Sequence, residues 1–145
     1  MYQLNVKSVF LYGELKEVVF VEQPQGYEKK SQEYKVYKLK KASYDLKQAP
    51  HAWYSRIEAH FVKKRFERCN CDHTLFIQIE DGGKILIVSL YVDNLIFTGN
   101  DESIFVKFKN SIKLEFEMTN LEKMKYFLRV EILQNPEGIY ISQRK

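Results

Sequence analysis

The stretch that decides the fold of this chain is Ile85-Leu86-Ile87-Val88-Ser89-Leu90-Tyr91-Val92-Asp93-Asn94-Leu95-Ile96-Phe97. Its apolar and β-branched residues predict two strands, residues 84–92 and 95–98, joined by a turn at Asp93-Asn94. An acidic residue at the tip of an apolar hairpin is well placed to hold a metal ion beside a rigid sheet. Asp-Asn is also ordinary turn chemistry, so this stretch alone leaves both interpretations open.

The segments on either side of the hairpin predict further strands. A breaker cluster, Gln23-Pro24-Gln25-Gly26, and two tight turns, Asp81-Gly82-Gly83 and Asn135-Pro136-Glu137-Gly138, separate short β-branched or aromatic runs. The predicted strands are residues 1–6, 18–21, 36–39, 74–80, 126–133 and 139–142. An irregular or short helical stretch is expected between the first two.

Two amphipathic helices complete the pattern. Trp53, Ile57 and Phe61 recur every four residues and predict a helix that begins near Pro50 and ends near Phe66. A second helix is predicted after its cap Asp101, with one apolar face made of Ile104, Phe105, Phe108 and Ile112. Thr119-Asn120-Leu121-Glu122 has the spacing of a capping box. We therefore expect an α+β fold: an antiparallel sheet with two helices on one face.

Composition restricts the class of protein. A chain of 145 residues suits one domain, and 45% hydrophobic with 14% aromatic residues is typical of a globular protein, not a disordered one. No apolar run approaches the roughly 20 residues that span a bilayer, and residues 1–6 lack the features of a signal peptide. We expect no membrane partner and an intracellular protein. Two cysteines are too few for a disulfide scaffold.

Positive charge is concentrated in one segment. Residues 35–68 hold ten Lys and Arg residues against three acidic ones, a local net charge of +7 in a chain whose net charge is +4. Such an asymmetry indicates either a surface that faces a polyanion or a solvated basic face. Four potential zinc ligands lie nearby, but their spacing matches no standard finger and we expect no zinc site. They are His60, Cys69, Cys71 and His73.

Several segments, in order, resemble motifs of copia-type retrotransposon reverse transcriptases. Tyr91-Val92-Asp93-Asn94 resembles the Tyr-Val-Asp-Asp box of that family. The other matching segments are Asn5-Val6-Lys7-Ser8-Val9-Phe10-Leu11-Tyr12-Gly13-Glu14-Leu15, Val21-Glu22-Gln23-Pro24-Gln25-Gly26-Tyr27, Lys40-Lys41-Ala42-Ser43-Tyr44-Asp45-Leu46-Lys47-Gln48-Ala49-Pro50-His51-Ala52-Trp53-Tyr54, Asp72-His73-Thr74-Leu75-Phe76, Phe97-Thr98-Gly99-Asn100 and Tyr126-Phe127-Leu128. The resemblance covers nearly the whole chain.

The resemblance implies an RNA-directed DNA polymerase with a ferredoxin-like palm. It implies that residues 1–145 are a partial reverse transcriptase domain, the palm with part of the fingers, truncated at both ends so that the N-terminal fingers and the downstream region are missing. Its partners would be an RNA or DNA template with its primer, and deoxynucleotides. Its cofactor would be magnesium, as two ions that clamp the primer hydroxyl and the nucleotide phosphates.

The resemblance also assigns the catalytic residues. Asn5, Asp93 and Asn94 match the three carboxylates that hold the ions, and only Asp93 keeps its charge as a metal ligand. Two divalent cations about 4 Å apart repel by ~17 kcal/mol at an effective dielectric of ~20. We therefore expect an impaired metal site and an inactive polymerase. Asn5 should lie beside the Asp93-Asn94 turn on a neighbouring strand, with Phe10 nearby.

Two nucleotide-binding residues are implied as well. Phe10 matches the aromatic residue that excludes a ribose 2′-hydroxyl, and Lys47 matches a lysine near the incoming phosphates. From the residues alone, a core position for Phe10 and a surface charge for Lys47 remain open. Asp45 and Arg129 stand where the family pattern has glycine, in the template-supporting motif and in the part that resembles the primer-grip hairpin.

The departures from the family pattern suggest genomic decay. Five of them each need one G-to-A change in a codon: Asn5, Asp45, His51, Asn94 and Arg129. Tyr12 and Ser43 do not follow this rule. The sequence thus leaves three hypotheses: an RNA-directed DNA polymerase by descent, with Asp93 as the surviving metal ligand; a non-catalytic nucleic-acid-binding remnant that uses the basic residues 35–68; and a decayed reading frame without function.

Overall fold

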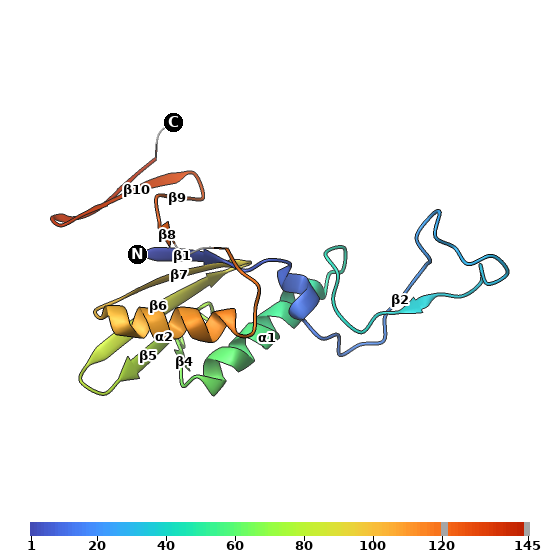
Figure 1. Cartoon of the computed structure of the whole chain (residues 1–145), viewed down its shortest axis with the longest axis horizontal. Coiled ribbons are helices and arrows are strands. Elements are labelled where there is room, and N and C mark those ends of the chain that lie inside the picture. The colour runs from blue at the N-terminus through green and yellow to red at the C-terminus, as the bar shows by residue number, and fades with distance from the viewer. Residues whose placement is uncertain (120–121, 144–145) are drawn as a thin grey trace. The chain divides into compact units, whose positions relative to one another are not determined.

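Most strands lie in one antiparallel sheet. In the computed structural model, which describes residues 1–119 and 122–143, its strands are β1 (Tyr2–Asn5), β4 (Glu67–Arg68), β5 (Leu75–Glu80), β6 (Lys84–Tyr91), β7 (Asn94–Gly99) and β8 (Glu122–Lys123). Their order is β4-β5-β6-β7-β1-β8 (Figure 1). The first strand of the chain thus lies between β7 and β8, beside a hairpin almost ninety residues further on.

The meander β5-β6-β7 confirms the predicted strands around residues 85–97. Glu80 pairs with Lys84, and the turn between them contains Gly82 and Gly83 at φ 82° and 74°. Those left-handed angles are ones that glycine adopts without steric cost. The short strands β4 and β8 were not predicted, because two charged residues each carry no hydrophobic alternation.

The turn between β6 and β7 lies one residue earlier than predicted. Tyr91 pairs with Asn94, so the two loop residues are Val92 and Asp93, and Asn94 begins β7. Val92 has φ 53°, a left-handed angle that is rare for a β-branched residue. The Asp-Asn preference for turns therefore gave the wrong register, because Asn94 is held in the sheet between Tyr91 and Asn5.

An aromatic core lies between this sheet and α2 (Glu102–Lys113), which packs against β6. The predicted face of α2 is confirmed: Ile104, Phe108 and Ile112 are buried, and Phe105 is partly buried and stacks edge-on against Phe97. Core ring contacts, with centroids 4.6–5.8 Å apart, join Phe61 to Phe76, Phe66 to Phe108 and Phe97 to Phe108. Burial of these rings stabilises the packing of α2 on the sheet.

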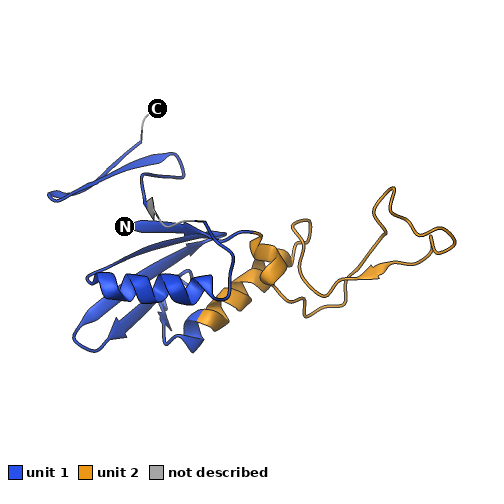
Figure 2. Cartoon of the chain, in the orientation of Figure 1, with its two compact units in different colours: residues 1–7, 61–145 blue, residues 8–60 orange. Residues whose placement is uncertain are grey.

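The chain divides into two compact units, residues 1–7 with 61–145, and residues 8–60 (Figure 2). The second unit contains η1 (Val9–Tyr12), the two-residue strands β2 (Phe20–Val21) and β3 (Tyr37–Lys38), and most of α1 (Ala49–Lys63). The predicted helix after residue 49 is thereby confirmed, with Trp53 and Ile57 buried. Gly13 lets the chain approach α1 closely, since a Cβ there would lie 2.8 Å from Ala52.

A small separate sheet, in the order β11-β10-β9, ends the described chain. Its strands are β9 (Tyr126–Phe127), β10 (Val130–Asn135) and β11 (Gly138–Ser142). The prediction of one strand over residues 126–133 is wrong, because Leu128 and Arg129 form a tight turn at φ 48° and 67°. The predicted turn at Asn135 is confirmed: its Oδ1 accepts hydrogen bonds from the Glu137 and Gly138 N–H groups, both at 3.0 Å.

The fold is thus α+β, with two α-helices and antiparallel sheets. Where one sheet was expected, the described residues form three, of six, three and two strands. The placement of α1 on the same sheet face as α2 stays a prediction. The expected capping box includes Asn120 and Leu121, which lie outside the described residues. Within residues 1–119 and 122–143, no helix is long and apolar enough to cross a membrane.

Candidate active site

Three polar residues meet at one end of the six-stranded sheet. Asn5 is the last residue of β1, Asn94 is the first of β7, and the two are direct partners across the ladder. The Val6 N–H donates to the Asp93 carbonyl oxygen at 2.8 Å, which ties the end of β1 to the turn. The expected adjacency of Asn5 to the Asp93-Asn94 segment is therefore observed, and it follows from the pairing of β1 with β7.

A chain of amide hydrogen bonds closes around the Asp93 carboxylate. Asn5 Nδ2 donates to Asp93 Oδ2 at 2.7 Å, and Asn94 Nδ2 donates to Asp93 Oδ1 at 2.8 Å. Because an ionised carboxylate only accepts hydrogen bonds, both amide nitrogens must face it. Hydrogen bonds to a charged group are worth about 1.5–3 kcal/mol each, so this arrangement stabilises the metal-free turn.

Gln3 extends this network and was missed by the sequence analysis. Its Nε2 donates to Asn94 Oδ1 at 2.6 Å. Gln3 precedes Asn5 by two residues on the same strand, so both side chains lie on the same face of the sheet. This two-residue spacing from Asn5 was the sequence signal that could have placed Gln3 at the site. We name Gln3, Asn5, Asp93 and Asn94 the amide network; all four side chains are half-buried.

Backbone strain and aromatic packing mark the same end of the sheet. Val92, at φ 53°, directly precedes Asp93, and residues held in such angles cluster at functional sites. The ring of Tyr91 contacts that of Phe127 edge-on, with centroids 5.4 Å apart. This contact joins the end of β9 to the end of β6.

Phe10 and Lys47 belong to the second unit. Phe10 is half-buried in η1, where its ring meets that of Tyr44 at 4.7 Å and packs against a cluster of Ala42, Ala49 and Ala52. Lys47 is exposed just before α1. Phe10 thus has the core position, and Lys47 the surface position, that the sequence left open as alternatives to a nucleotide-binding role. The nucleotide-binding roles of Phe10 and Lys47, and their proximity to Asp93, stay predictions.

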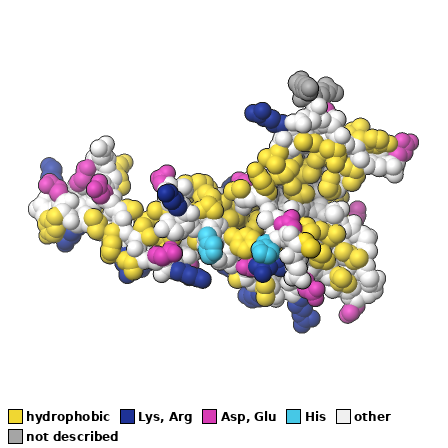
Figure 3. Space-filling model, turned by 180° about the vertical axis from the view of Figure 1, so that it is seen from behind, with side chains coloured by type: hydrophobic (Ala, Val, Ile, Leu, Met, Phe, Trp, Pro, Cys, Tyr) yellow, Lys and Arg dark blue, Asp and Glu magenta, His cyan; other side chains and the backbone are white. Residues whose placement is uncertain are grey.

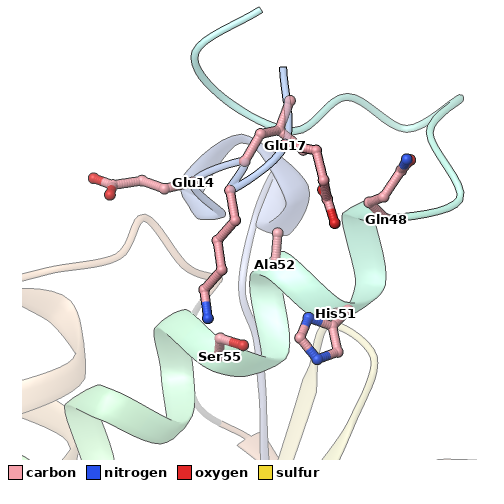
Figure 4. Close-up of a pocket in the computed structure, with 8 residues that line it drawn as sticks. Glu14, Glu17, Gln48, His51, Ala52 and Ser55 are labelled. Carbon is pink, nitrogen blue, oxygen red and sulfur yellow. The ribbon is translucent and has the colours of Figure 1, made fainter. Parts of the chain in front are cut away.

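One small pocket in the second unit lies at the start of α1. Its lining includes Glu14, Glu17, Gln48, His51 and Ser55, and its volume is about 120 Å³ (Figure 4). Ligand pockets of drug-sized molecules are typically 300–1,000 Å³, so this one is too small for a nucleotide. Its lining holds two carboxylates, Glu14 and Glu17, and one lysine, Lys16, so a phosphate group would meet more negative than positive charge.

The candidate site offers one carboxylate as a metal ligand. Across residues 1–119 and 122–143, no cluster of three or more His, Cys, Asp and Glu side chains is placed to hold a metal ion. The one potential ligand, Asp93, has both oxygens engaged by amide donors. A magnesium ion would have to displace those donors or turn the amides so that their oxygens face it.

Comparison with known proteins agrees with this arrangement of strands and motifs. The whole chain, residues 1–145, matches the family described as reverse transcriptase (RNA-dependent DNA polymerase). The chain belongs to the reverse transcriptase family. No solved structure matches it significantly.

The curated relatives of this reverse transcriptase chain are retrotransposon proteins. It is 35% identical over 143 residues to the retrovirus-related Pol polyprotein from transposon RE1 of Arabidopsis thaliana, covering 99% of this chain and 10% of that protein. It is 30% identical over 145 residues to the Pol polyprotein from transposon TNT 1-94 of Nicotiana tabacum, covering 99% and 11%. A putative transposon Ty5-1 protein from Saccharomyces cerevisiae is 30% identical over 135 residues, covering 93% and 44%.

These relatives confirm the resemblance to copia-type elements over nearly the whole chain. The chain spans about a tenth of the length of the first curated relatives it matches. It is thus a reverse transcriptase domain of the kind found in retrotransposon Pol polyproteins.

Proposed function

We propose that this chain is a reverse transcriptase palm, with part of the fingers, whose two-metal centre has been replaced by the amide network. The six-stranded sheet with Asn5 and Asp93 at one end supports a ferredoxin-like palm, since the three matched positions converge there. The template, primer, deoxynucleotides and magnesium would be those of the family.

The observation that carries the proposal is the double hydrogen bond to Asp93. Each carboxylate oxygen accepts from one amide nitrogen, of Asn5 and of Asn94. This donor set does not fit two magnesium ions: it supplies one negative charge where the family pattern supplies three. Amide oxygens can ligate magnesium, but they do not offset the repulsion between two divalent ions. The chain is therefore proposed to be inactive as a polymerase.

A graft experiment tests this proposal. Residues 1–145 replace the matching segment of a complete, active copia-type enzyme, and primer extension is measured with magnesium. Positions 5 and 94 are reverted to Asp, and positions 45 and 129 to Gly, singly and jointly. We expect background extension from the unreverted graft and from every single reversion, because metal ligands act as a unit. Only the joint reversion should restore extension.

A matched control is His51→Arg. This reversion also restores a family residue, but His51 lies on α1 in the second unit and belongs to the pocket there, not to the amide network. It should leave extension at background. Robust extension by the unreverted graft would overturn the proposal, because two amides would then serve as ligands.

A second function, nucleic-acid binding without catalysis, is favoured by the exposed lysines of the second unit. Lys35, Lys38, Lys40, Lys41 and Lys47 are all exposed. Neutralised phosphates release counterions, so binding through these residues should weaken steeply with salt. Replacing the first four with Gln should flatten the salt dependence of primer–template binding. The same number of Gln substitutions at Lys109, Lys113, Lys123 and Lys125, outside residues 35–68, serves as the control.

A further inference from the structure

Among residues 1–119 and 122–143, the strand β11 forms a free sheet edge that is longer than the other edge strands. It is the outermost strand of the sheet β11-β10-β9. The outer strands of the six-stranded sheet, β4 and β8, have two residues each, all charged. By contrast, β11 has five residues, Gly138-Ile139-Tyr140-Ile141-Ser142, and no charge. Short, charged strands are how proteins protect edges from pairing, and β11 has no such protection.

The side chains of β11 are exposed although they are apolar. Ile139, Tyr140 and Ile141 are 50%, 52% and 67% exposed. Figure 3 shows hydrophobic side chains gathered over the part of the molecule that carries this sheet. Leu133, opposite Tyr140 on β10, is exposed as well. Both faces of this edge strand therefore carry exposed apolar side chains, which favours association with another protein surface.

The backbone groups that point to the free edge can be assigned. The Ile132 N–H donates to the Lys125 carbonyl at 2.7 Å, on the β9 side of β10, so it points away from β11. Opposite residues in an antiparallel pair exchange both hydrogen bonds or neither. Ile141, the partner of Ile132, therefore directs its N–H and C=O to the free edge, and so does Ile139 two residues earlier.

This edge is complementary to itself. A second copy can pair antiparallel to β11 about a twofold axis at Tyr140. In this register, Ile139 of each copy lies opposite Ile141 of the other, which gives two such pairs. Both residues direct their backbone groups outward, so each pair can exchange two hydrogen bonds. The same pairing brings isoleucines together on one face and the two Tyr140 rings together on the other. In this single register, the outward backbone groups form hydrogen bonds and like side chains meet on each face. This match favours a second copy of the chain over an unrelated strand.

The acidic residue before β11 supports the antiparallel direction. Glu137 directly precedes β11. Antiparallel pairing centred on Tyr140 places the two Glu137 residues at opposite ends of the paired strands, whereas parallel pairing would bring them together. We propose that the free edge of β11 binds a second copy of this chain, so that one antiparallel sheet continues across a twofold axis.

The oligomeric state of the 145-residue chain tests this proposal. Sedimentation velocity over a range of concentrations should show a monomer–dimer equilibrium. Ile141→Lys places a charge at the edge and should raise the dimer dissociation constant at least about tenfold. Leu114→Lys is the matched control: Leu114 is 84% exposed at the end of α2 and should leave the constant unchanged. Circular dichroism verifies that both variants fold.

Hydrogen exchange locates the interface. The amides of Ile139 and Ile141 should become protected as concentration rises, whereas that of Tyr140, which faces β10, should be protected throughout. A chain that is monomeric at all concentrations overturns the proposal. So does association that Ile141→Lys leaves unchanged. Protection of Ile139 and Ile141 in a monomer would assign the edge to another segment of the same chain, and would overturn it too.

Discussion

At the scale of single residues, the amide network holds the Asp93 carboxylate with hydrogen bonds. Three carboxylates at these positions would repel one another unless a cation lay between them. Asn5 and Asn94 carry no such charge and supply two donors to Asp93. We therefore expect this end of the sheet to need no cation for stability, and the dependence on magnesium can be measured.

The double variant Asn5→Asp with Asn94→Asp should make stability depend on magnesium. Without metal we expect a loss of about 2–3 kcal/mol, because two hydrogen bonds to a carboxylate are lost and like charges meet. Millimolar magnesium should recover much of it, while the parent chain should not respond. Thermal unfolding with and without magnesium measures both. The control, Asn70→Asp with Asn110→Asp, makes the same charge change at two exposed positions. A metal-free double variant as stable as the parent contradicts this interpretation.

Arg129→Gly should stabilise the chain. Arg129 has φ 67° in the β9-β10 turn, and a residue with a Cβ costs roughly 1–2 kcal/mol in that region. Glycine regains this energy but loses some through its greater freedom when unfolded, so we expect a net gain of about 1 kcal/mol. Urea unfolding gives the value. Ser142→Gly, in the extended strand β11, is the control and should destabilise.

The resemblance located positions 5, 93, 94 and 129, but local chemistry misplaced the turns around them. Val92 and Leu128-Arg129 adopt left-handed angles although none of them is glycine or asparagine, so the local sequence gave no sign of a turn at these residues. Strand pairing on both sides forces those angles, and pairing between distant segments cannot be read from local propensity. Gln3 was missed for a similar reason: its partner Asn94 is 91 residues away.

At the scale of elements, α2 shows that local sequence is sufficient to predict a helix, its buried face and its cap. Its face and its cap were both predicted, because periodicity and capping act within a few residues. The Asp101 side chain accepts hydrogen bonds from the Ser103 hydroxyl and from the Ser103 N–H, the latter at 2.8 Å. The Ser103 hydroxyl, followed by Lys84, lowers the pKa of Asp101 to about 2.

Asp101→Ala should therefore lower the midpoint of thermal unfolding by a few degrees at pH 7. A carboxyl whose pKa is lower in the folded state stabilises above its unfolded pKa, about 3.9, and loses this effect as pH falls through about 2. The difference between parent and variant should thus shrink between pH 4 and pH 2. Glu102→Ala, at the next residue, which is exposed, is the control. A difference that stays constant over that range contradicts the assignment.

Gly99 at the end of β7 allows a close strand contact. A Cβ at this position would lie 2.2 Å from the Ile85 carbonyl oxygen and 2.9 Å from the Phe105 ring. Gly99→Ala should therefore force β6 and β7 apart and destabilise by about 1–3 kcal/mol. Chemical denaturation measures the loss. Thr98→Ala, one residue earlier, should cost less, and equal losses would contradict the steric explanation.

At the scale of the whole molecule, the two units differ in how much they bury. Residues 14–48 of the second unit contain only the two-residue strands β2 and β3. Several of their large side chains are exposed, including Phe20, Tyr27 and Tyr34. Segments with little buried apolar surface open at low free energy.

Limited trypsin digestion should cut first within this segment. We expect early cleavage at Lys29, Lys30 and Lys35, before any cut at Lys107 or Lys109, which lie on α2. Mass spectrometry of early fragments gives the order. The comparison inside one chain is its own control, since all five sites face the same protease. First cleavage within α2 would contradict the difference between the units.

The position of β1 in the sheet has a consequence for synthesis on the ribosome. β1 emerges before its partners in β7 and β8, which follow about ninety and one hundred and twenty residues later. The meander β5-β6-β7 closes short loops and can form early, whereas closing the loop to β1 costs more entropy. β1 must therefore wait for its partners until β7 and β8 have left the ribosome. Insertion of β1 between β7 and β8 is then the step that both completes the sheet and assembles the amide network.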